Sequence, residues 1–350
     1  MSNKIPVGVL GATGAVGQKF VKLLEGHPWF ELVELAASDR SAGKSYEEAT
    51  SWRQYTKIPE NLRRRTVRPC EPGLDCKLVF SGLDASVAGE VEEEFARAGY
   101  TVVSNSKNHR MDEDVPLLVP EINPEHLGLI KVQRERRGWA GAIVTNPNCS
   151  TIGLVMALAP IERAFGIRRL VVTTMQSVSG AGYPGPPSID MLGNVLPFIP
   201  GEEEKLETEP LKILGKLEGG RIRPAEFGVS AHTNRVFVED GHMECVSLEM
   251  ERKASPDEVS AALAGFTSIP QELKLPSAPE RPIIVREERD RPQPRYDRDE
   301  GNGMSAVVGR LRPCPVFDVR FLVLSHNTIR GAAGAAILNA EIMKAQGYLD

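Results

Sequence analysis

A glycine-rich segment near the N-terminus places the strongest constraint on the fold of this chain. The segment from Gly11 to Gly17 has the spacing Gly-x-x-Gly-x-x-Gly. It follows an apolar run that predicts a buried strand, residues 5–10, and precedes a predicted helix at about 15–25. Glycines permit a tight turn and a close approach of a ligand to the backbone, and a helix N-terminus favours phosphate. We therefore expect a dinucleotide to bind at Gly11, Thr13, Gly14, Ala15, Val16 and Gly17.

Further strands and helices alternate along the first part of the chain. Apolar runs predict strands at 31–37, 78–81, 101–104 and 142–145, and a helical pattern covers about 87–98. This alternation predicts a doubly wound, mainly parallel sheet, so the expected fold class is α/β with a Rossmann-type N-terminal domain. Ligands collect at the carboxyl ends of the strands in such sheets. Three polar or glycine-rich segments follow predicted strands: 11–17, 104–105 and 146–149.

The residues after the second predicted strand bear on the choice of dinucleotide. That strand ends 20 residues after Gly17, where an NAD-specific protein carries an acid for the ribose 2′-hydroxyl. This chain reads Ser-Asp-Arg-Ser at 38–41, an arginine flanked by hydroxyls, which suits a 2′-phosphate. NADP is therefore the expected cofactor, with contacts from Ser38, Arg40 and Ser41. Asp39 does not fit this pattern; it either faces solvent or allows some use of NAD.

Cys149 is the candidate nucleophile. It belongs to the hexapeptide Asn-Pro-Asn-Cys-Ser-Thr at 146–151, between a strand-like run and a helical pattern that begins at Ile152. A cysteine at a helix N-terminus ionises more easily than a free one, because unpaired N–H groups and the helix dipole favour an anion. A thiolate can attack an acyl group, and the same N–H groups can hold an oxyanion. The alternative is a small buried core residue, as most single cysteines are.

The second half of the chain contributes more polar candidates. A predicted strand, 169–175, leads to Gln176 and a flexible glycine-rich segment. Strands are also predicted at 229–238 and 242–251. They are joined by Glu-Asp-Gly, which predicts a β-hairpin with Arg235 and His242 beside its turn.

A polar helix is predicted between these strands, from about 202 to 217, and holds Glu209 and Lys212. These two residues are three apart on a helix and can form an ordinary surface pair. Gln176 can simply satisfy backbone groups at a strand end. A single histidine after a turn is more often structural than catalytic.

Composition argues against several other classes of protein. A net charge of −5 and a pI near 5.8 are not those of a nucleic-acid binder, and no apolar stretch reaches the roughly 18 residues of a membrane span. The five cysteines form no Cys-x-x-Cys pair, so neither a zinc site nor a disulfide framework is indicated. The start of the chain has no apolar signal-peptide segment. We expect a cytoplasmic protein that acts on small molecules without a bound metal.

Over nearly its whole length the sequence resembles the aspartate-β-semialdehyde dehydrogenase family, in its archaeal and fungal branch. The segment 11–17 resembles the family's cofactor loop, and Asn148-Cys149-Ser150-Thr151 resembles its nucleophile motif. The resemblance implies that Gln176 orients the substrate, that Arg235 grips its α-carboxylate, and that His242 is the acid/base. It also implies substrate contacts from Asn148, Arg110, Glu209 and Lys212, and cofactor contacts from Ser179, Gly180, Gly182 and Asn327.

The resemblance further implies an activity and an architecture. The activity is NADPH-dependent reduction of β-aspartyl phosphate to aspartate semialdehyde through a Cys149 thioester, a step towards lysine, threonine and methionine. Residues 1–148 and 328–350 are expected to form the NADP-binding domain, and 149–327 an α+β substrate and dimerisation domain. A homodimer or a dimer of dimers is expected. Malonyl-CoA reductase, an offshoot of the same branch, and a non-catalytic NADP-sensing protein remain as alternatives.

Overall fold

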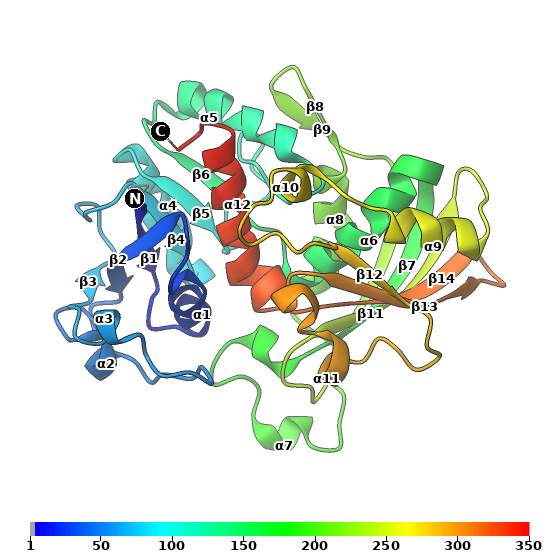
Figure 1. The fold of residues 1–350 in the computed structure, drawn as a ribbon, viewed down its shortest axis with the longest axis horizontal. Helices are drawn as coiled ribbons and strands as arrows, with labels where there is room; N and C mark the ends of the chain where they lie inside the picture. The colour runs from blue at the N-terminus through cyan, green and yellow to red at the C-terminus, as the bar shows by residue number, and fades with distance from the viewer. Residues whose placement is uncertain (1–3, 350) are drawn as a thin grey trace.

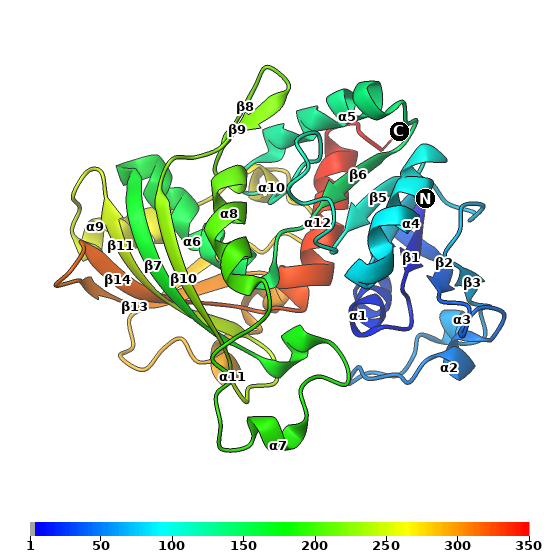
Figure 2. The same cartoon turned by 180° about the vertical axis from the view of Figure 1, so that it is seen from behind.

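Two six-stranded sheets lie side by side, and helix α12 (Gly334–Ala345) runs between them (Figure 1). The computed structural model describes residues 4–349, so the outermost bounds of the expected domains, 1–3 and 350, lie outside the described part. The view from behind shows the same arrangement (Figure 2). Within residues 4–349 no helix is both long enough and apolar enough to cross a bilayer.

The first sheet is parallel throughout and has the order β3-β2-β1-β4-β5-β6. Its strands are β1 (Ile5–Leu10), β2 (Phe30–Ala37), β3 (Arg68–Pro69), β4 (Leu78–Ser81), β5 (Thr101–Ser104) and β6 (Ala142–Thr145). The order reverses beside β1, which places a ligand crevice at the carboxyl ends of β1 and β4. The expected doubly wound fold is confirmed.

Helices cover both faces of this sheet because its strands are apolar on both sides. Side chains of α1 (Ala15–Leu24) and α12 pack with β1 in one core cluster. Side chains of α4 (Ala85–Arg97) pack with β4 and β5 in another. The remaining helices of this half are α2 (Tyr46–Ala49), α3 (Glu60–Arg63), η1 (Pro124–Gly128) and α5 (Leu129–Arg137).

The second sheet is mixed, with the order β10-β7-β11-β14-β13-β12. Its strands are β7 (Ile167–Gln176), β10 (Gly228–Arg235), β11 (His242–Met250), β12 (Ile283–Arg286), β13 (Ala306–Pro313) and β14 (Val319–Ser325). Only one face is fully buried, against α6 (Cys149–Phe165), α8 (Glu202–Ile213) and α9 (Pro256–Ala264). Along β11 buried residues alternate with more exposed ones, as a sheet with one covered face requires.

The predicted hairpin between residues 229–238 and 242–251 is wrong. β10 pairs in parallel with β7, and β11 pairs antiparallel with the other edge of β7, so β7 separates them. The Glu-Asp-Gly segment does turn the chain, and Gly241 has a φ of +104°. A turn signal reports that the chain reverses locally; it does not report which strands pair. Arg235 and His242 still meet, because each lies next to the carboxyl end of β7.

Other boundaries differ from expectation by a few residues. Helix α8 ends at Ile213 instead of 217, and the chain continues into a small hairpin of β8 (Lys216–Glu218) and β9 (Arg221–Arg223). A π-helical turn, Ile329–Ala333, precedes α12. The short helical segments not yet named are η2 (Val178–Ala181), α7 (Ser188–Met191), α10 (Ile269–Glu272), α11 (Pro294–Asp297) and η3 (Glu300–Gly303).

Candidate active site

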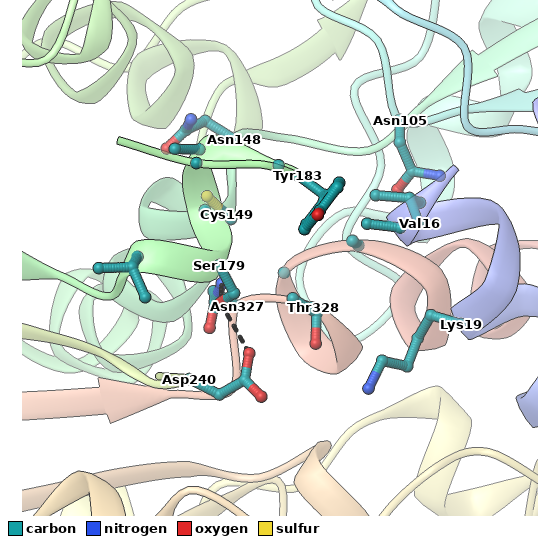
Figure 3. Close-up of a pocket in the computed structure, with 18 of the residues that line it drawn as sticks. Val16, Lys19, Asn105, Asn148, Cys149, Ser179, Tyr183, Asp240, Asn327 and Thr328 are labelled. Atoms are coloured by element: carbon teal, nitrogen blue, oxygen red, sulfur yellow. Dashed lines mark hydrogen bonds between the residues drawn. The ribbon is translucent and has the colours of Figure 1, made fainter. Parts of the chain in front are cut away.

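A cavity of about 1150 Å³ lies between the two sheets. One wall comes from α1 and the loop after β5, with Val16, Lys19 and Asn105 (Figure 3). The other comes from the start of α6, with Cys149, and from the segment after β7. The cavity is also lined by Ala15, Arg110, Asn148, Ser179, Gly180, Gly182, Tyr183, Glu202, Lys205, Asp240, Asn327 and Thr328. The structure thus brings the predicted cofactor loop and the predicted nucleophile to one cavity.

Cys149 and His242 form a contact pair at this cavity. Cys149 is the first residue of α6 and is half-buried. His242 is the first residue of β11 and is buried. The Sγ atom of Cys149 lies 3.2 Å from Nε2 of His242. That is hydrogen-bond distance for a nucleophile and its acid/base partner.

The electrostatic setting of this pair differs from the expectation. Burial raises the pKa of the Cys149 thiol to about 12, and the Glu202 carboxylate acts in the same direction, while Arg110 and Arg235 oppose it. Burial lowers the pKa of His242 to about 3, reinforced by the charge of Arg235. The prediction that Cys149 ionises more easily than a free cysteine is therefore wrong: desolvation outweighs the helix N-terminus.

The backbone N–H groups of the first turn of α6 are also less available than expected. Asn148 is the N-cap residue, and its Oδ1 accepts from the N–H groups of Ser150 (2.9 Å) and Thr151 (3.4 Å). Since Asn148 occupies them, these two groups cannot also hold an oxyanion. Its Nδ2 donates to Glu202.

Arg235 lies beside His242 although their strands, β10 and β11, are not adjacent in the sheet. It ends β10, opposite Gln176 at the end of β7, and its Nη1 donates to the carbonyl oxygen of Ser177 (2.9 Å). Gly180 covers both side chains: a Cβ there would lie 2.8 Å from Nη1 of Arg235 and 2.9 Å from Cε1 of His242. Any larger residue at 180 would therefore displace the arginine or the histidine.

Glu202 is the main site residue that the sequence did not reveal. It opens α8 and accepts hydrogen bonds from Nε2 of Gln176 (3.2 Å) and Nδ2 of Asn148 (2.9 Å). Lys205, one turn later, forms an ion pair with it. Both line the cavity beside Cys149. The available signal was a second Glu–Lys pair with the same three-residue spacing, seven residues nearer the start of the helix than Glu209 and Lys212.

Glu209 and Lys212, the predicted substrate-binding pair, lie behind the cavity wall and not in it. Glu209 accepts from Nη1 of Arg110 (3.0 Å) and from the backbone N–H of Asn148 (2.6 Å). Nζ of Lys212 donates to the carbonyl oxygens of Arg110, Asp112 and Val115 at 2.7–2.8 Å. An ammonium has three N–H donors, and all three are used here. The prediction that Glu209 and Lys212 contact the substrate is therefore corrected: the two residues support the loop that carries Arg110.

The loop between β1 and α1 fits a dinucleotide. Gly11 has a φ of +75°, and a Cβ on Gly17 would lie 2.1 Å from the carbonyl oxygen of Gly11. Only glycine permits this close crossing of turn and helix. Thr13 and Gly14 form the turn, and Ala15 and Val16 line the cavity at the N-terminus of α1. The cradle matches what a pyrophosphate requires.

The residues expected at the ribose phosphate lie at the carboxyl end of β2. Ser38 and Arg40 are exposed there, and Ser41 is half-buried. Nζ of Lys44 donates to the carbonyl oxygen of Arg40 (2.8 Å). Lys44 therefore stabilises the loop that contains Arg40. Arg40 follows β2, which pairs with β1, so it lies at the same carboxyl edge of the sheet as the glycine loop.

Asn327 and Ser179 form a hydrogen-bonded group on the Cys149 side of the cavity. Nδ2 of Asn327 donates to Oγ of Ser179 (2.8 Å), and Oγ of Ser179 donates to Oδ1 of Asp240 (2.7 Å; Figure 3). Oδ1 of Asn327 accepts from the N–H of Gly241 (2.8 Å). Figure 3 shows these residues next to Cys149 and across the cavity from Val16 and Lys19.

Comparisons with known proteins agree with this geometry. A family model described as "Semialdehyde dehydrogenase, NAD binding domain" matches residues 6–130, and one described as "Semialdehyde dehydrogenase, dimerisation domain" matches residues 158–330. An aspartate-semialdehyde dehydrogenase of Archaeoglobus fulgidus is 54% identical over 96% of this chain and 97% of its own length. One from Schizosaccharomyces pombe is 47% identical over 98% of this chain and 99% of its own length.

A solved structure supports the same conclusion. The crystal structure of aspartate semialdehyde dehydrogenase with NADP from Candida albicans superposes with a TM-score of 0.91 at 45% identity, covering 99% of both chains. A fold shared over the full length, a nucleophile facing the cofactor loop, and identities of this size are consistent with one another. The chain belongs to the aspartate-semialdehyde dehydrogenase family.

Proposed function

We propose that this protein reduces β-aspartyl phosphate to aspartate semialdehyde and phosphate with NADPH, through a thioester on Cys149. The observation that carries the proposal is the 3.2 Å contact between Nε2 of His242 and Sγ of Cys149, a residue that lines the same cavity as Ala15 and Val16 of the glycine loop. A binding protein that only sensed the dinucleotide would need no such pair. The product is a precursor of lysine, threonine and methionine.

The charged side chains in the cavity wall and directly behind it complement this substrate. The guanidinium of Arg235 binds the α-carboxylate in a bidentate manner. Glu202 binds the α-ammonium, and this role replaces the one expected for Glu209. Arg110, whose side chain Glu209 holds at the cavity wall, and Lys205 bind the acyl phosphate. Gln176, fixed by Glu202, orients the acyl group towards Cys149.

The chemistry begins with both members of the pair neutral. The negative phosphate and carboxylate of the substrate stabilise an imidazolium, so they raise the proton affinity of His242 as the site closes on the substrate. His242 takes the thiol proton, the sulfur attacks the acyl carbon, and phosphate leaves. Bound NADPH supplies the hydride that reduces the thioester. His242 then returns its proton as the thiolate departs from the product carbon.

The cofactor is held along the carboxyl edge of the first sheet. The loop from Gly11 to Gly17 receives the pyrophosphate, and Arg40 with Ser38 and Ser41 receives the 2′-phosphate. The segment with Ser179, Gly180 and Gly182, together with Asn327, faces the nicotinamide. The close crossing of the turn and helix α1 at Gly17 and the position of Arg40 beside β1 support this placement.

Reverse turnover tests the proposal. Aspartate semialdehyde, phosphate and NADP should yield NADPH, and Cys149→Ala should abolish the reaction while NADP still binds. Malonyl-CoA with NADPH serves as the competing assay: a faster rate than with the aspartyl substrate would assign the protein to malonyl-CoA reduction. Turnover that survives Cys149→Ala would exclude the thioester mechanism.

The division into domains follows from the same proposal. Residues 1–148 and 328–350 form the NADP-binding domain, and 149–327 form the substrate and dimerisation domain. The packing of α12 in the core of the first sheet and of α6 against the second supports these bounds. The protein acts in the cytoplasm as a homodimer or a dimer of dimers. The match of residues 158–330 to a dimerisation-domain model supports self-association, and light scattering in solution measures it.

A further inference from the structure

Ser177 faces the other ring nitrogen of His242. It directly follows β7 and is fully buried. Its backbone N–H donates to Nδ1 of His242 (3.1 Å), and its Oγ lies 3.1 Å from the same nitrogen. Among residues 4–349, Ser177 alone hydrogen-bonds Nδ1. The hydrogen bonding of Nδ1 within the described residues therefore depends on this one residue.

The two groups of Ser177 make different demands on the imidazole. A backbone N–H can only donate, so it favours a ring with a lone pair on Nδ1 and the proton on Nε2. Nε2 is the atom that faces the sulfur of Cys149. With a proton already there, it has no lone pair to accept the thiol proton. The ring can act as a base at Nε2 only when Nδ1 carries the hydrogen, and Nδ1–H then needs an acceptor.

The hydroxyl of Ser177 is that acceptor, because it can reverse its role. Its own hydrogen has a second destination, Oδ1 of Asn327, at 3.1 Å. Asn327 is held in place from two sides, by the N–H of Gly241 at 2.8 Å and by Oγ of Ser179 at 2.8 Å. When the hydroxyl hydrogen points to Asn327, a lone pair of Oγ is free for Nδ1–H.

We propose that Ser177 is the positioning residue of the acid/base histidine, a role that rests on the proposed function and adds to it. In the proton transfer the Sγ–H bond of Cys149 breaks, its electron pair stays on sulfur, and Nε2 of His242 binds the proton. Nδ1–H donates to Oγ of Ser177, which donates to Oδ1 of Asn327. The hydroxyl thus stabilises the imidazolium in a site where burial opposes it, as does the backbone N–H of Ser177, which loses its acceptor once Nδ1 is protonated.

Ser177→Ala tests the proposal, with Ser177→Thr as the conservative variant. Ser325→Ala is the matched control: Ser325 is also a buried serine, it lies opposite His242 on β14, and its Oγ has no partner within residues 4–349. Two quantities are measured for each variant across pH: the rate at which iodoacetamide alkylates Cys149, and kcat and KM in reverse turnover. Thermal denaturation checks that each variant is folded.

Loss of a hydrogen bond to a charged group predicts a fall in kcat of roughly 10- to 100-fold at neutral pH for Ser177→Ala. KM for aspartate semialdehyde should change little, and the pH at which Cys149 becomes reactive should move upward. Ser177→Thr, which keeps the hydroxyl, and Ser325→Ala should keep the wild-type pH profile.

Three outcomes contradict the inference. A Ser177→Ala profile that superposes on the wild type overturns it, and so does a fall in kcat without any shift of the pH profile, which denotes a purely structural role. A Ser177→Thr variant that is folded but behaves like Ser177→Ala also overturns it. An active wild type with one of these results leaves the proposed function intact, whereas an inactive wild type, with no thioester at Cys149, overturns the proposed function itself.

Discussion

The side chains that surround Cys149 act on its sulfur in opposite directions. Burial and the Glu202 carboxylate raise the pKa of the thiol, whereas Arg110 and Arg235 lower it. The net effect is a thiol that stays protonated until a partner removes its proton. Such a nucleophile is protected from chance alkylation and oxidation, and its reactivity depends on His242.

Glu202→Gln separates the two roles of this carboxylate. Removing the negative charge lowers the pKa of Cys149, so alkylation of the thiol at neutral pH should become faster. The α-ammonium of the substrate loses its ionic partner, so KM for aspartate semialdehyde should rise roughly 10- to 100-fold. Glu204→Gln, an exposed position on the same helix, is the control. An unchanged KM for Glu202→Gln would contradict the assignment.

Lys212→Met and Lys205→Met distinguish a supporting lysine from a binding one. Lys212 holds three carbonyl oxygens of the Arg110 loop, so its loss should lower the free energy of unfolding by about 1–3 kcal/mol. Lys205 lines the cavity, and its loss should raise KM for phosphate with little effect on stability. Chemical denaturation and initial-rate measurements report both quantities. The reverse pattern would restore Lys212 as the phosphate ligand.

The predictable site residues are those whose role is set by a local motif. Cys149 has a strand before it and a helix after it, and His242 follows a turn; both positions can be inferred from the sequence. Glu202 and Glu209 cannot be told apart in this way, because they are seven residues apart, about two helical turns, and lie on the same side of α8. Which helical turn of α8 faces the nucleophile depends on how α8 packs against α6. That packing is tertiary structure, which the local sequence does not determine.

At the scale of elements, the turn between β1 and α1 shows how a backbone crossing defines a binding site. A Cβ on Gly17 would meet the carbonyl oxygen of Gly11 at 2.1 Å and the Cα of Ala12 at 2.7 Å. A Cβ on Gly14 would lie 3.4 Å from that same oxygen, an ordinary contact. The two glycines therefore serve different purposes: Gly17 permits the turn to form, and Gly14 keeps the outer surface of the turn open.

Substitution by alanine at these two positions should have separable effects. Gly17→Ala forces the turn apart, so the free energy of unfolding should fall by about 1–3 kcal/mol and NADP should bind more weakly. Gly14→Ala should weaken NADP binding while stability stays within about 0.5 kcal/mol of the wild type. Calorimetric titration with NADP and chemical denaturation measure the two quantities. Equal losses of stability would contradict the distinction.

Element positions follow from the sequence more reliably than element partners. Five of the six strands of the first sheet lie within one residue of the apolar runs that predicted them, because buried parallel strands need uninterrupted apolar residues. The two-residue strand β3 was not predicted. The neighbours of β10 and β11 could not be predicted, since β7, more than 50 residues earlier in the chain, lies between them. Nor did any periodicity single out the edge strand β12 or its neighbour β13.

At the scale of the whole molecule, one buried ion pair ties the C-terminal segment to the centre of the protein. Arg330 donates to Glu121 through Nη1 (2.6 Å) and Nη2 (2.8 Å), and both side chains are fully buried. Arg330 lies in the turn between Asn327 and α12. The pair therefore fixes the position of a cavity residue as well as the return of the last helix to the first sheet.

Breaking this pair should destabilise the protein strongly. Glu121→Gln leaves a buried guanidinium without a counter-charge, so the free energy of unfolding should fall by about 3–5 kcal/mol. Glu218→Gln removes one partner of an exposed ion pair with Arg223 and should leave stability unchanged. Urea denaturation of both variants provides the comparison. Equal stability of the two variants would show that the buried pair does not hold the C-terminal segment.

The return of the chain to its first domain is a property that local patterns do not encode. The final helix is apolar enough for a core position, but nothing in its residues says which sheet it covers. Only the family resemblance predicted that the final helix returns to the first sheet. In the structure α12 shares a core cluster with Val7, Phe20 and Phe80.

The central claim is that Cys149 carries the acyl group during reduction. The most direct measurement mixes the protein with aspartate semialdehyde and NADP while phosphate is withheld, and maps peptides by mass spectrometry. A burst of NADPH equal to the number of active sites and an aspartyl thioester at Cys149 are the expected result. Turnover that begins on adding phosphate, with no adduct at Cys149 beforehand, would contradict the account.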